Sequence, residues 1–209
     1  MSIIANTYYH SDINLIAGTD GQLESVSESW QAIYEEIILK KLLGYDLYAL
    51  YVADLATTPT TPQSPTLQRF KDLVDGKDLT FEVKGYTVST RWIGLRDSTM
   101  LKSLIAYYVY YNYRNETESS NSGAGQILPL PENSTKADVR PKLINTWNKM
   151  IDWYGLTPNS IISKEYFLNT GNYRHYNSLA SAYNFLLANI DTYPEWVFEP
   201  LEKQNIFGI

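Results

Sequence analysis

Few residues in this chain have the types and spacing that catalysis or metal binding requires. The two histidines, His10 and His175, belong to no His-x-x-x-His or Glu-x-x-His pair, so a metal site has little support. We interpret His175, which lies among Asn, Tyr and Arg residues, as a polar loop residue. The absence of cysteine excludes disulfides, cysteine-ligated zinc and thiol nucleophiles, and it fits a reducing compartment.

Motifs for nucleophilic or phosphate chemistry are also missing. The sequence has no Gly-x-Ser-x-Gly turn and no Walker A loop, and the Gly-Ala-Gly at 123–125 lacks the third glycine of a dinucleotide-binding loop. Glu28, Glu35 and Glu36 could act as paired carboxylates in glycoside hydrolysis. They fall on the polar side of an amphipathic helix pattern, where a solvated face is expected. We therefore predict no enzyme activity and no cofactor. A cell-wall glycan hydrolase acting through Glu35 or Glu36 is kept as an alternative.

Aromatic side chains are abundant, with 18 tyrosines and 5 tryptophans among 209 residues. Such side chains stack on sugars, stack on single-stranded bases, or anchor protein interfaces. Base stacking normally accompanies a basic groove, whereas this chain has a net charge of -6 and no basic tract. Most of the aromatic residues recur at helical spacing beside Leu and Ile, which favours core and interface positions. Sugar binding by a helical module stays open as a second interpretation.

The densest aromatic segment, 101–113, has the pattern of a helix that is covered on nearly all sides. One face carries an ordinary core stripe formed by Met100, Leu104, Tyr107, Tyr108 and Tyr111. Val109, Tyr110 and Tyr113 fall on the other side. Because a tyrosine ring with its polar tip suits a surface buried against a partner, this pattern indicates an assembly protein. A central helix inside one larger core explains the pattern equally well.

These residues must be positioned by a set of helices. Hydrophobic periodicity, capping residues and the positions of Gly and Pro predict helices over about 25–41, 45–56, 67–74, 98–114, 138–154 and 178–190. Gly44 should end the first helix, and Asp97 or Ser98 should cap the tyrosine-rich one. Alternating apolar residues on both sides of Lys84-Gly85 predict a β-hairpin at about 79–92.

The fold class predicted is mainly α: a helical bundle with a small β-hairpin and extended N- and C-terminal arms. We divide the chain into an N-terminal arm (1–24), a helical domain (25–192) with a long loop at 115–135, and a C-terminal docking tail (193–209). The tail holds too many apolar residues to remain undocked. There is no leader-like N-terminus and no apolar run of about 20 residues, so we expect neither secretion nor membrane insertion.

The order of segments resembles that of a family of phage proteins. A Leu42-Leu-Gly-Tyr-Asp-Leu-Tyr48 corner is followed by Arg69-Phe70, a hairpin, Trp92-Ile-Gly-Leu95 and the tyrosine-rich helix. A loop with Glu132-Asn133 and a helix with Asn145-Thr-Trp-Asn148 come next. Between about Ser27 and Tyr154 this order is similar to head–tail connector (adaptor or ring) proteins of tailed bacteriophages, particularly crAss-like and other phages of Bacteroidetes. The hairpin and the long tail extend the shorter helical bundles of that family.

The resemblance implies a structural virion protein at the head–tail junction, made in the host cytoplasm. Further copies of the chain would form a homo-oligomeric ring, a dodecamer. Its other partners would be the portal protein and the next tail or ring protein. Genomic DNA would pass through the lumen without specific binding, which an acidic chain suits. Another tail-completion or terminator ring protein is the nearest alternative. The interface anchors that we expect are Trp92, Tyr107, Tyr110, Tyr113, Trp196, Phe198 and Phe207.

Overall fold

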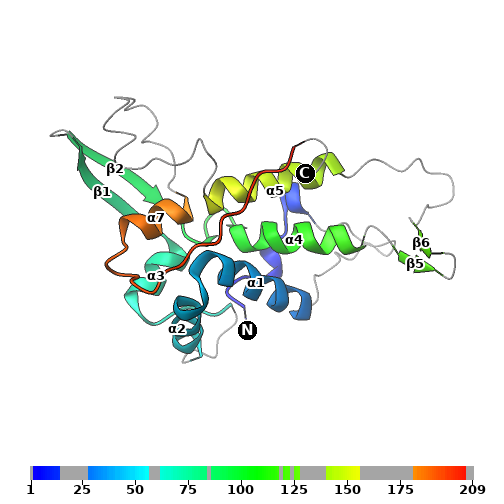
Figure 1. The fold of residues 1–209 in the computed structure, drawn as a ribbon, viewed down its shortest axis with the longest axis horizontal. Helices are drawn as coiled ribbons and strands as arrows, with labels where there is room; N and C mark the ends of the chain where they lie inside the picture. Colours follow the sequence, from blue (N-terminus) through cyan, green and yellow to red (C-terminus); the bar gives the residue numbers. More distant parts are fainter. Residues whose placement is uncertain are drawn as a thin grey trace.

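The computed structural model confirms a mainly helical chain with a small β-hairpin (Figure 1). The residues that it describes are 2–14, 28–56, 62–83, 86–117, 120–122, 125–127, 140–155 and 181–205, without the side chains of 81–88 and 118–139. All of the predicted helices have counterparts among these residues, with the differences at their ends given below.

The first two helices, α1 (Glu28–Leu43) and α2 (Tyr45–Leu55), meet at a tight corner, as predicted. Gly44 joins them with a φ of +76°, a left-handed conformation that favours glycine. An added Cβ would also lie 2.9 Å from the Cβ of Val197 in the C-terminal tail. The glycine therefore makes the corner and leaves room for the tail to cross it.

Helix α3 (Gln68–Asp75) starts on a cap supplied by another helix. The carboxylate of Asp54 in α2 accepts hydrogen bonds from the backbone N–H groups of Thr66 (2.8 Å) and Leu67 (3.1 Å). Residues just before and at a helix start carry amide groups that need an outside acceptor. The Asp54 carboxylate supplies it, which ties the segment before α3 to α2.

The predicted β-hairpin is present and is slightly longer than expected. Strands β1 (Lys77–Val83) and β2 (Tyr86–Trp92) pair antiparallel, with Val83 opposite Tyr86 and Lys77 opposite Trp92. A two-stranded sheet is marginal in water and needs support. The base of this one leans on the core of its own chain, because Leu79 and Trp92 are buried. A second short pair, β5 (Ser120–Ser122) with β6 (Gly125–Ile127), lies inside the predicted 115–135 loop and was not expected.

The tyrosine-rich helix α4 (Leu104–Thr117) begins later than predicted. Two short strands, β3 (Arg96–Asp97) and β4 (Lys102–Ser103), pair just before it. The Ser103 hydroxyl accepts a hydrogen bond from the N–H of Ile105 (3.1 Å) and donates one to the Leu95 carbonyl (2.8 Å). Asp97 instead accepts from Thr99 and Met100 N–H groups in a turn. The predicted cap at Asp97 or Ser98 was therefore wrong.

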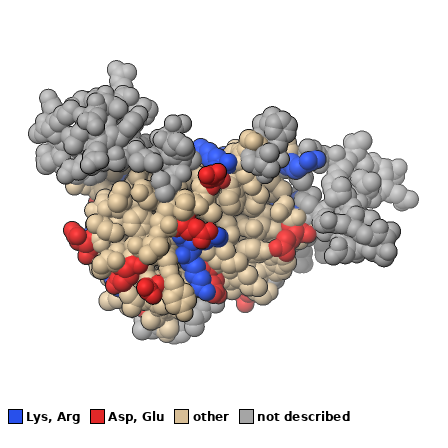
Figure 2. All heavy atoms as spheres, in the orientation of Figure 1, with Lys and Arg blue, Asp and Glu red and all other residues tan. Residues whose placement is uncertain are grey.

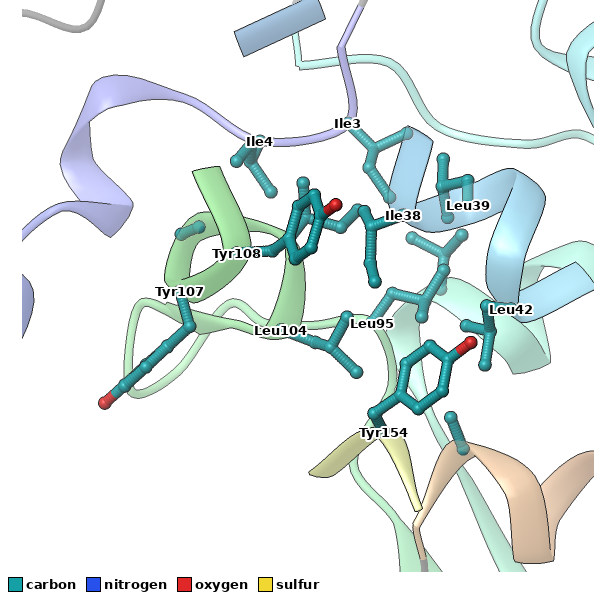
Figure 3. Packing of buried hydrophobic residues seen from close by; sticks show 14 of the residues in the cluster. Ile3, Ile4, Ile38, Leu39, Leu42, Leu95, Leu104, Tyr107, Tyr108 and Tyr154 are labelled. Carbon is teal, nitrogen blue, oxygen red and sulfur yellow. The ribbon is translucent and has the colours of Figure 1, made fainter. Parts of the chain in front are cut away.

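Helices α1, α4 and α5 (Arg140–Tyr154) lie side by side, with α4 between the other two (Figure 1). Their apolar side chains meet those of the N-terminal segment in one core, as Figure 3 shows for Ile3, Ile38, Leu104 and Tyr154. Both sides of α4 are covered within the chain, since Val109 and Tyr110 are buried along with Tyr107. A single core therefore accounts for the all-round apolar pattern of α4, which is the alternative that the sequence left open.

Both arms pack along this bundle. The N-terminal segment forms two short 3₁₀ turns, η1 (Asn6–Tyr8) and η2 (Ser11–Ile13), and buries Ile3, Ile4, Tyr8, Tyr9 and Ile13. After α7 (Ala182–Ala188), which is shorter than predicted, the tail runs back across the bundle toward the upper end of α5 (Figure 1). The Glu199 N–H donates to the Lys41 carbonyl (2.9 Å). The described part of the tail thus packs on its own chain.

Candidate functional site

The predicted anchor Trp92 lies in the interior of the folded chain and cannot meet a partner there. Its side chain is fully buried, its ring stacks on Phe185 with centroids 5.6 Å apart, and its indole N–H donates to the Leu73 carbonyl (2.9 Å). Each polar and apolar part of Trp92 is therefore used inside the fold. Its role is to hold the hairpin base between α3 and α7, and the expected interface role is corrected on this ground.

The three predicted tyrosine anchors of α4 differ in their surroundings. Tyr110 is 2% exposed and belongs to the core. Tyr107 is also buried, with its hydroxyl donating to Asp12 (2.8 Å). Burial alone would raise the pKa of Asp12, but the hydrogen bonds from Lys149 and Tyr107 and the charge of Lys149 lower it. Tyr113 is half-buried, so it is the one of the three that still shows part of its ring at the surface.

Two of the three predicted tail anchors, Trp196 and Phe198, lie in an aromatic cluster of the same chain. Trp196 is half-buried and donates its indole N–H to the Leu42 carbonyl (2.8 Å). Phe198 lies 4.9 Å from both the Tyr154 and the Tyr183 ring. These contacts fasten the tail onto α1, α5 and α7. Phe207 lies outside the described residues, so its role stays a prediction.

Helix α1 presents an unusual distribution of polar and apolar side chains. It buries Gln31 and Glu35 together with Ile38 and Leu42 on the core side. At the same time it leaves apolar side chains at the surface, with Ile33 56% exposed. The partly exposed apolar positions of α1 recur at helical spacing and form one stripe, and a tyrosine side chain from α4 lies beside it. We name this surface the outer face; it consists of Trp30, Ile33, Tyr34, Ile37 and Tyr113.

The outer face is continuous because its rings touch. Trp30 lies 5.7 Å from Tyr34 and meets Tyr113 edge-on at the same centroid distance. The Tyr34 hydroxyl donates to the Glu116 carboxylate. Burial, followed by this hydrogen bond, raises the pKa of Tyr34 to about 12. The face therefore combines a neutral aromatic surface with one fixed carboxylate, a combination that suits a protein partner or a sugar ring.

Glu35 was expected on a solvated face, and this expectation was wrong. The side chain is 5% exposed, and its carboxylate accepts hydrogen bonds from the Ile3 N–H (3.0 Å) and the Ser2 hydroxyl. Gln31 completes the network by donating to the Ile4 carbonyl (2.9 Å). Burial raises the pKa of Glu35 to about 7. Glu36, by contrast, is half-exposed and pairs with Lys40, as a solvated face requires.

A pocket of about 180 Å³ opens beside Glu35, between α1 and α2. Apolar and polar groups share its wall, which is formed by Ala32, Glu35, Glu36, Leu39, Tyr48, Tyr51, Val52, Leu55 and Gln63. Tyr51 is fully buried, and its hydroxyl has no hydrogen-bond partner among the described residues. A buried hydroxyl without a partner is uncommon in folded proteins and often marks a site for water or a ligand.

Other kinds of site have no support among the described residues. No group of three His, Asp or Glu side chains there could hold a metal ion. His10 makes a structural tie, with Nε2 2.8 Å from the Leu101 carbonyl oxygen and Nδ1 2.8 Å from the Ser11 hydroxyl. His175 lies outside these residues. No helix in the described part of the chain is both long and apolar enough to span a bilayer.

Sequence reasoning missed the outer face and the pocket for the same reason. Apolar residues lie at 30, 33, 34, 37, 38 and 42 of α1, so the periodicity could not show which of them the core would take. The chain's own N-terminal segment decides this by supplying hydrogen-bond donors to Glu35. No protein-family model, curated protein or solved structure matches this chain.

Proposed function

We propose that this chain is a structural subunit of a tailed-phage virion, a head–tail connector that forms a ring beneath the portal. The observation that carries this proposal is the outer face, where α1 presents Ile33 to solvent while it buries Glu35. A helix that has apolar side chains on two sides normally covers both. The core covers one side, and a neighbouring subunit in the ring would cover the other.

The segment order between Ser27 and Tyr154 supports the same proposal through its resemblance to connector proteins. The charge distribution is compatible with it. In the face shown in Figure 2, acidic and basic side chains stand singly or in small groups among uncharged residues, and no extended basic patch is seen. A channel that lets DNA slide should lack such a patch, since neutralised phosphates would retain the DNA.

Co-expression with the portal protein encoded in the same genome tests this proposal. A tagged portal should retain the chain during purification, and electron micrographs should show an added ring of density at one end of the portal. A portal that purifies without the chain, and micrographs that match those of the portal alone, would contradict the connector role.

The second candidate is a helical carbohydrate-binding module. It is favoured by the partly exposed Trp30, Tyr34 and Tyr113 rings beside the Glu116 carboxylate, because sugars stack on rings and donate hydrogen bonds to carboxylates. A glycan array and quenching of tryptophan fluorescence by oligosaccharides separate the two candidates. Saturable quenching by one oligosaccharide would favour the module, whereas the connector should show none.

A further inference from the structure

The pocket between α1 and α2 is lined by the buried carboxylate of Glu35, which forms no ion pair with a described residue. None of the ion pairs between described residues includes Glu35, and the donors to its oxygens, the Ile3 N–H and the Ser2 hydroxyl, are neutral. The positive charges of the N-terminus and of Arg96 both act to lower the pKa of Glu35, but the Arg96 guanidinium is committed to Asp75, at 2.8 Å, and to carbonyl groups. A buried carboxylate in this position needs either a proton or a cation.

The rest of the pocket wall suits a bound cation. Glu36 lines the pocket as well, and Tyr48 and Tyr51 present aromatic rings, whose faces attract cations. The Nζ atom of Lys40 already lies 5.4 Å from the centroid of the Tyr48 ring, so this ring makes a contact with a cation in the folded chain. Lys40 pairs with Glu36 at 2.5 Å, so its charge is not directed to Glu35.

Size and polarity restrict the ligand further. A volume of about 180 Å³ holds several water molecules or one group the size of a side chain. Leu39, Val52 and Leu55 form an apolar part of the wall, against which an aliphatic stem can pack. The buried Tyr51 hydroxyl, whose pKa is raised by burial and by the charge of Glu35, supplies an oxygen near that carboxylate.

We propose that this pocket binds an alkylammonium or alkylguanidinium group. The charged end lies between Glu35 and the tyrosine side chains, and the stem lies against the apolar wall. Such a group occurs on a free amine and on a Lys or Arg side chain of another protein chain, and both share this chemistry. The inference does not depend on the connector role, because it rests on the pocket alone.

The test is a titration of the full-length protein with n-butylguanidinium, followed by NMR. The methyl signal of Ala32, which lines the pocket, should shift and saturate, whereas that of exposed Ala49 on α2 should not. The neutral comparator n-butanol should bind much more weakly, because it has the stem without the charge. Equal binding of n-butanol would overturn the proposal, because the pocket would then not select a cation. An Ala32 signal that does not move would also overturn it and leave a pocket that holds only water.

Two substitutions test the assigned groups. Glu35→Gln should weaken n-butylguanidinium binding about tenfold or more, since a charge-assisted contact is lost, whereas Glu28→Gln at the exposed start of α1 should change it less than about twofold. Tyr51→Phe removes only the hydroxyl and should also weaken binding. Unchanged affinity in both Glu35→Gln and Tyr51→Phe would place the ligand elsewhere and overturn the assignment.

A last comparison identifies the source of the cation. An arginine capped at both ends as an N-acetyl, N-methylamide derivative should bind at least as well as n-butylguanidinium if the natural occupant is a protein side chain. It should bind more weakly if the pocket takes a free amine, because the caps would then meet the pocket rim. Failure of both probes to bind the wild-type protein would overturn the proposal.

Discussion

Arg96 joins three segments that lie apart in the sequence. It is 7% exposed, and its guanidinium donates to the Ile3 carbonyl (2.7 Å), the Gln63 carbonyl (3.0 Å) and the Ser64 hydroxyl (2.9 Å). Its Nε also pairs with Asp75 at the end of α3. A planar guanidinium has five donors in fixed directions, so it can hold the N-terminal segment, the 62–65 loop and α3 together.

Arg96→Lys should therefore destabilise the subunit by about 2–3 kcal/mol, because a lysine ammonium cannot reach all of these acceptors and leaves buried carbonyl groups unpaired. Urea denaturation followed by circular dichroism measures this change. The matched control is Arg91→Lys on the hairpin, where the side chain is 55% exposed and the change should stay within about 0.5 kcal/mol. Equal losses in the two variants would show that Arg96 does not connect these segments.

Glu35 should give folding stability a distinctive pH dependence. Its pKa is raised from 4.5 to about 7 in the folded chain, so the folded state binds a proton that the unfolded state has lost in this range. The contribution is therefore fully present below pH 4.5 and is lost as the pH rises to about 7, by roughly 3 kcal/mol at most.

Glu35→Gln should remove this part of the pH dependence, since glutamine does not titrate. The free energy of unfolding, measured from pH 4.5 to 8 for both proteins, gives the difference curve. Glu36→Gln, which replaces the neighbouring half-exposed carboxylate, is the control. A wild-type slope retained in Glu35→Gln would mean that Glu35 titrates normally in the folded protein.

Positions such as Glu35 and Trp92 could not be assigned from the sequence. Glu35 resembles a surface residue until the Ser2 and Ile3 donors are placed beside it, and these lie more than thirty positions away in the chain. Trp92 is of a residue type that often anchors interfaces, but Phe185 covers it. Burial of a single side chain depends on long-range packing that local patterns do not contain.

Packing of the C-terminal tail stabilises the fold of the chain itself. Phe198 packs between Tyr154 of α5 and Tyr183 of α7, whereas the neighbouring Val197 is 68% exposed. Phe198→Ala should therefore lower the free energy of unfolding by about 2 kcal/mol, and Val197→Ala should change it by less than about 0.5 kcal/mol. Thermal melting monitored by circular dichroism compares the two variants. Equal melting temperatures would show that the tail does not stabilise the bundle.

Helices and the hairpin were largely predictable, whereas the ends that depend on distant partners were not. Gly44 ends α1 through its own backbone freedom, which a sequence shows directly. The start of α4 depends on Ser103, whose hydroxyl bonds to Leu95 across a pair of two-residue strands. Strands that short carry no alternation, so the pattern placed the cap too early.

The whole chain has a core that covers α4 without a partner, and it still carries an apolar outer face on α1. Under the proposed function, this division lets one chain fold alone and assemble afterwards. Ile33→Glu should leave helix content and the free energy of unfolding nearly unchanged, because the side chain is 56% exposed, and it should block ring formation by placing a charge in a desolvated contact. Leu187→Glu, which changes a 41% exposed residue of α7, is the matched control.

We propose that the outer face assembles this chain into a ring on a portal. Native mass spectrometry of the full-length protein, mixed with the portal protein of its genome, tests this directly. Wild type and Leu187→Glu should add about twelve copies to each portal, and Ile33→Glu should add none. A wild-type chain that stays monomeric beside the portal, or an Ile33→Glu chain that assembles as fully as wild type, would contradict the claim.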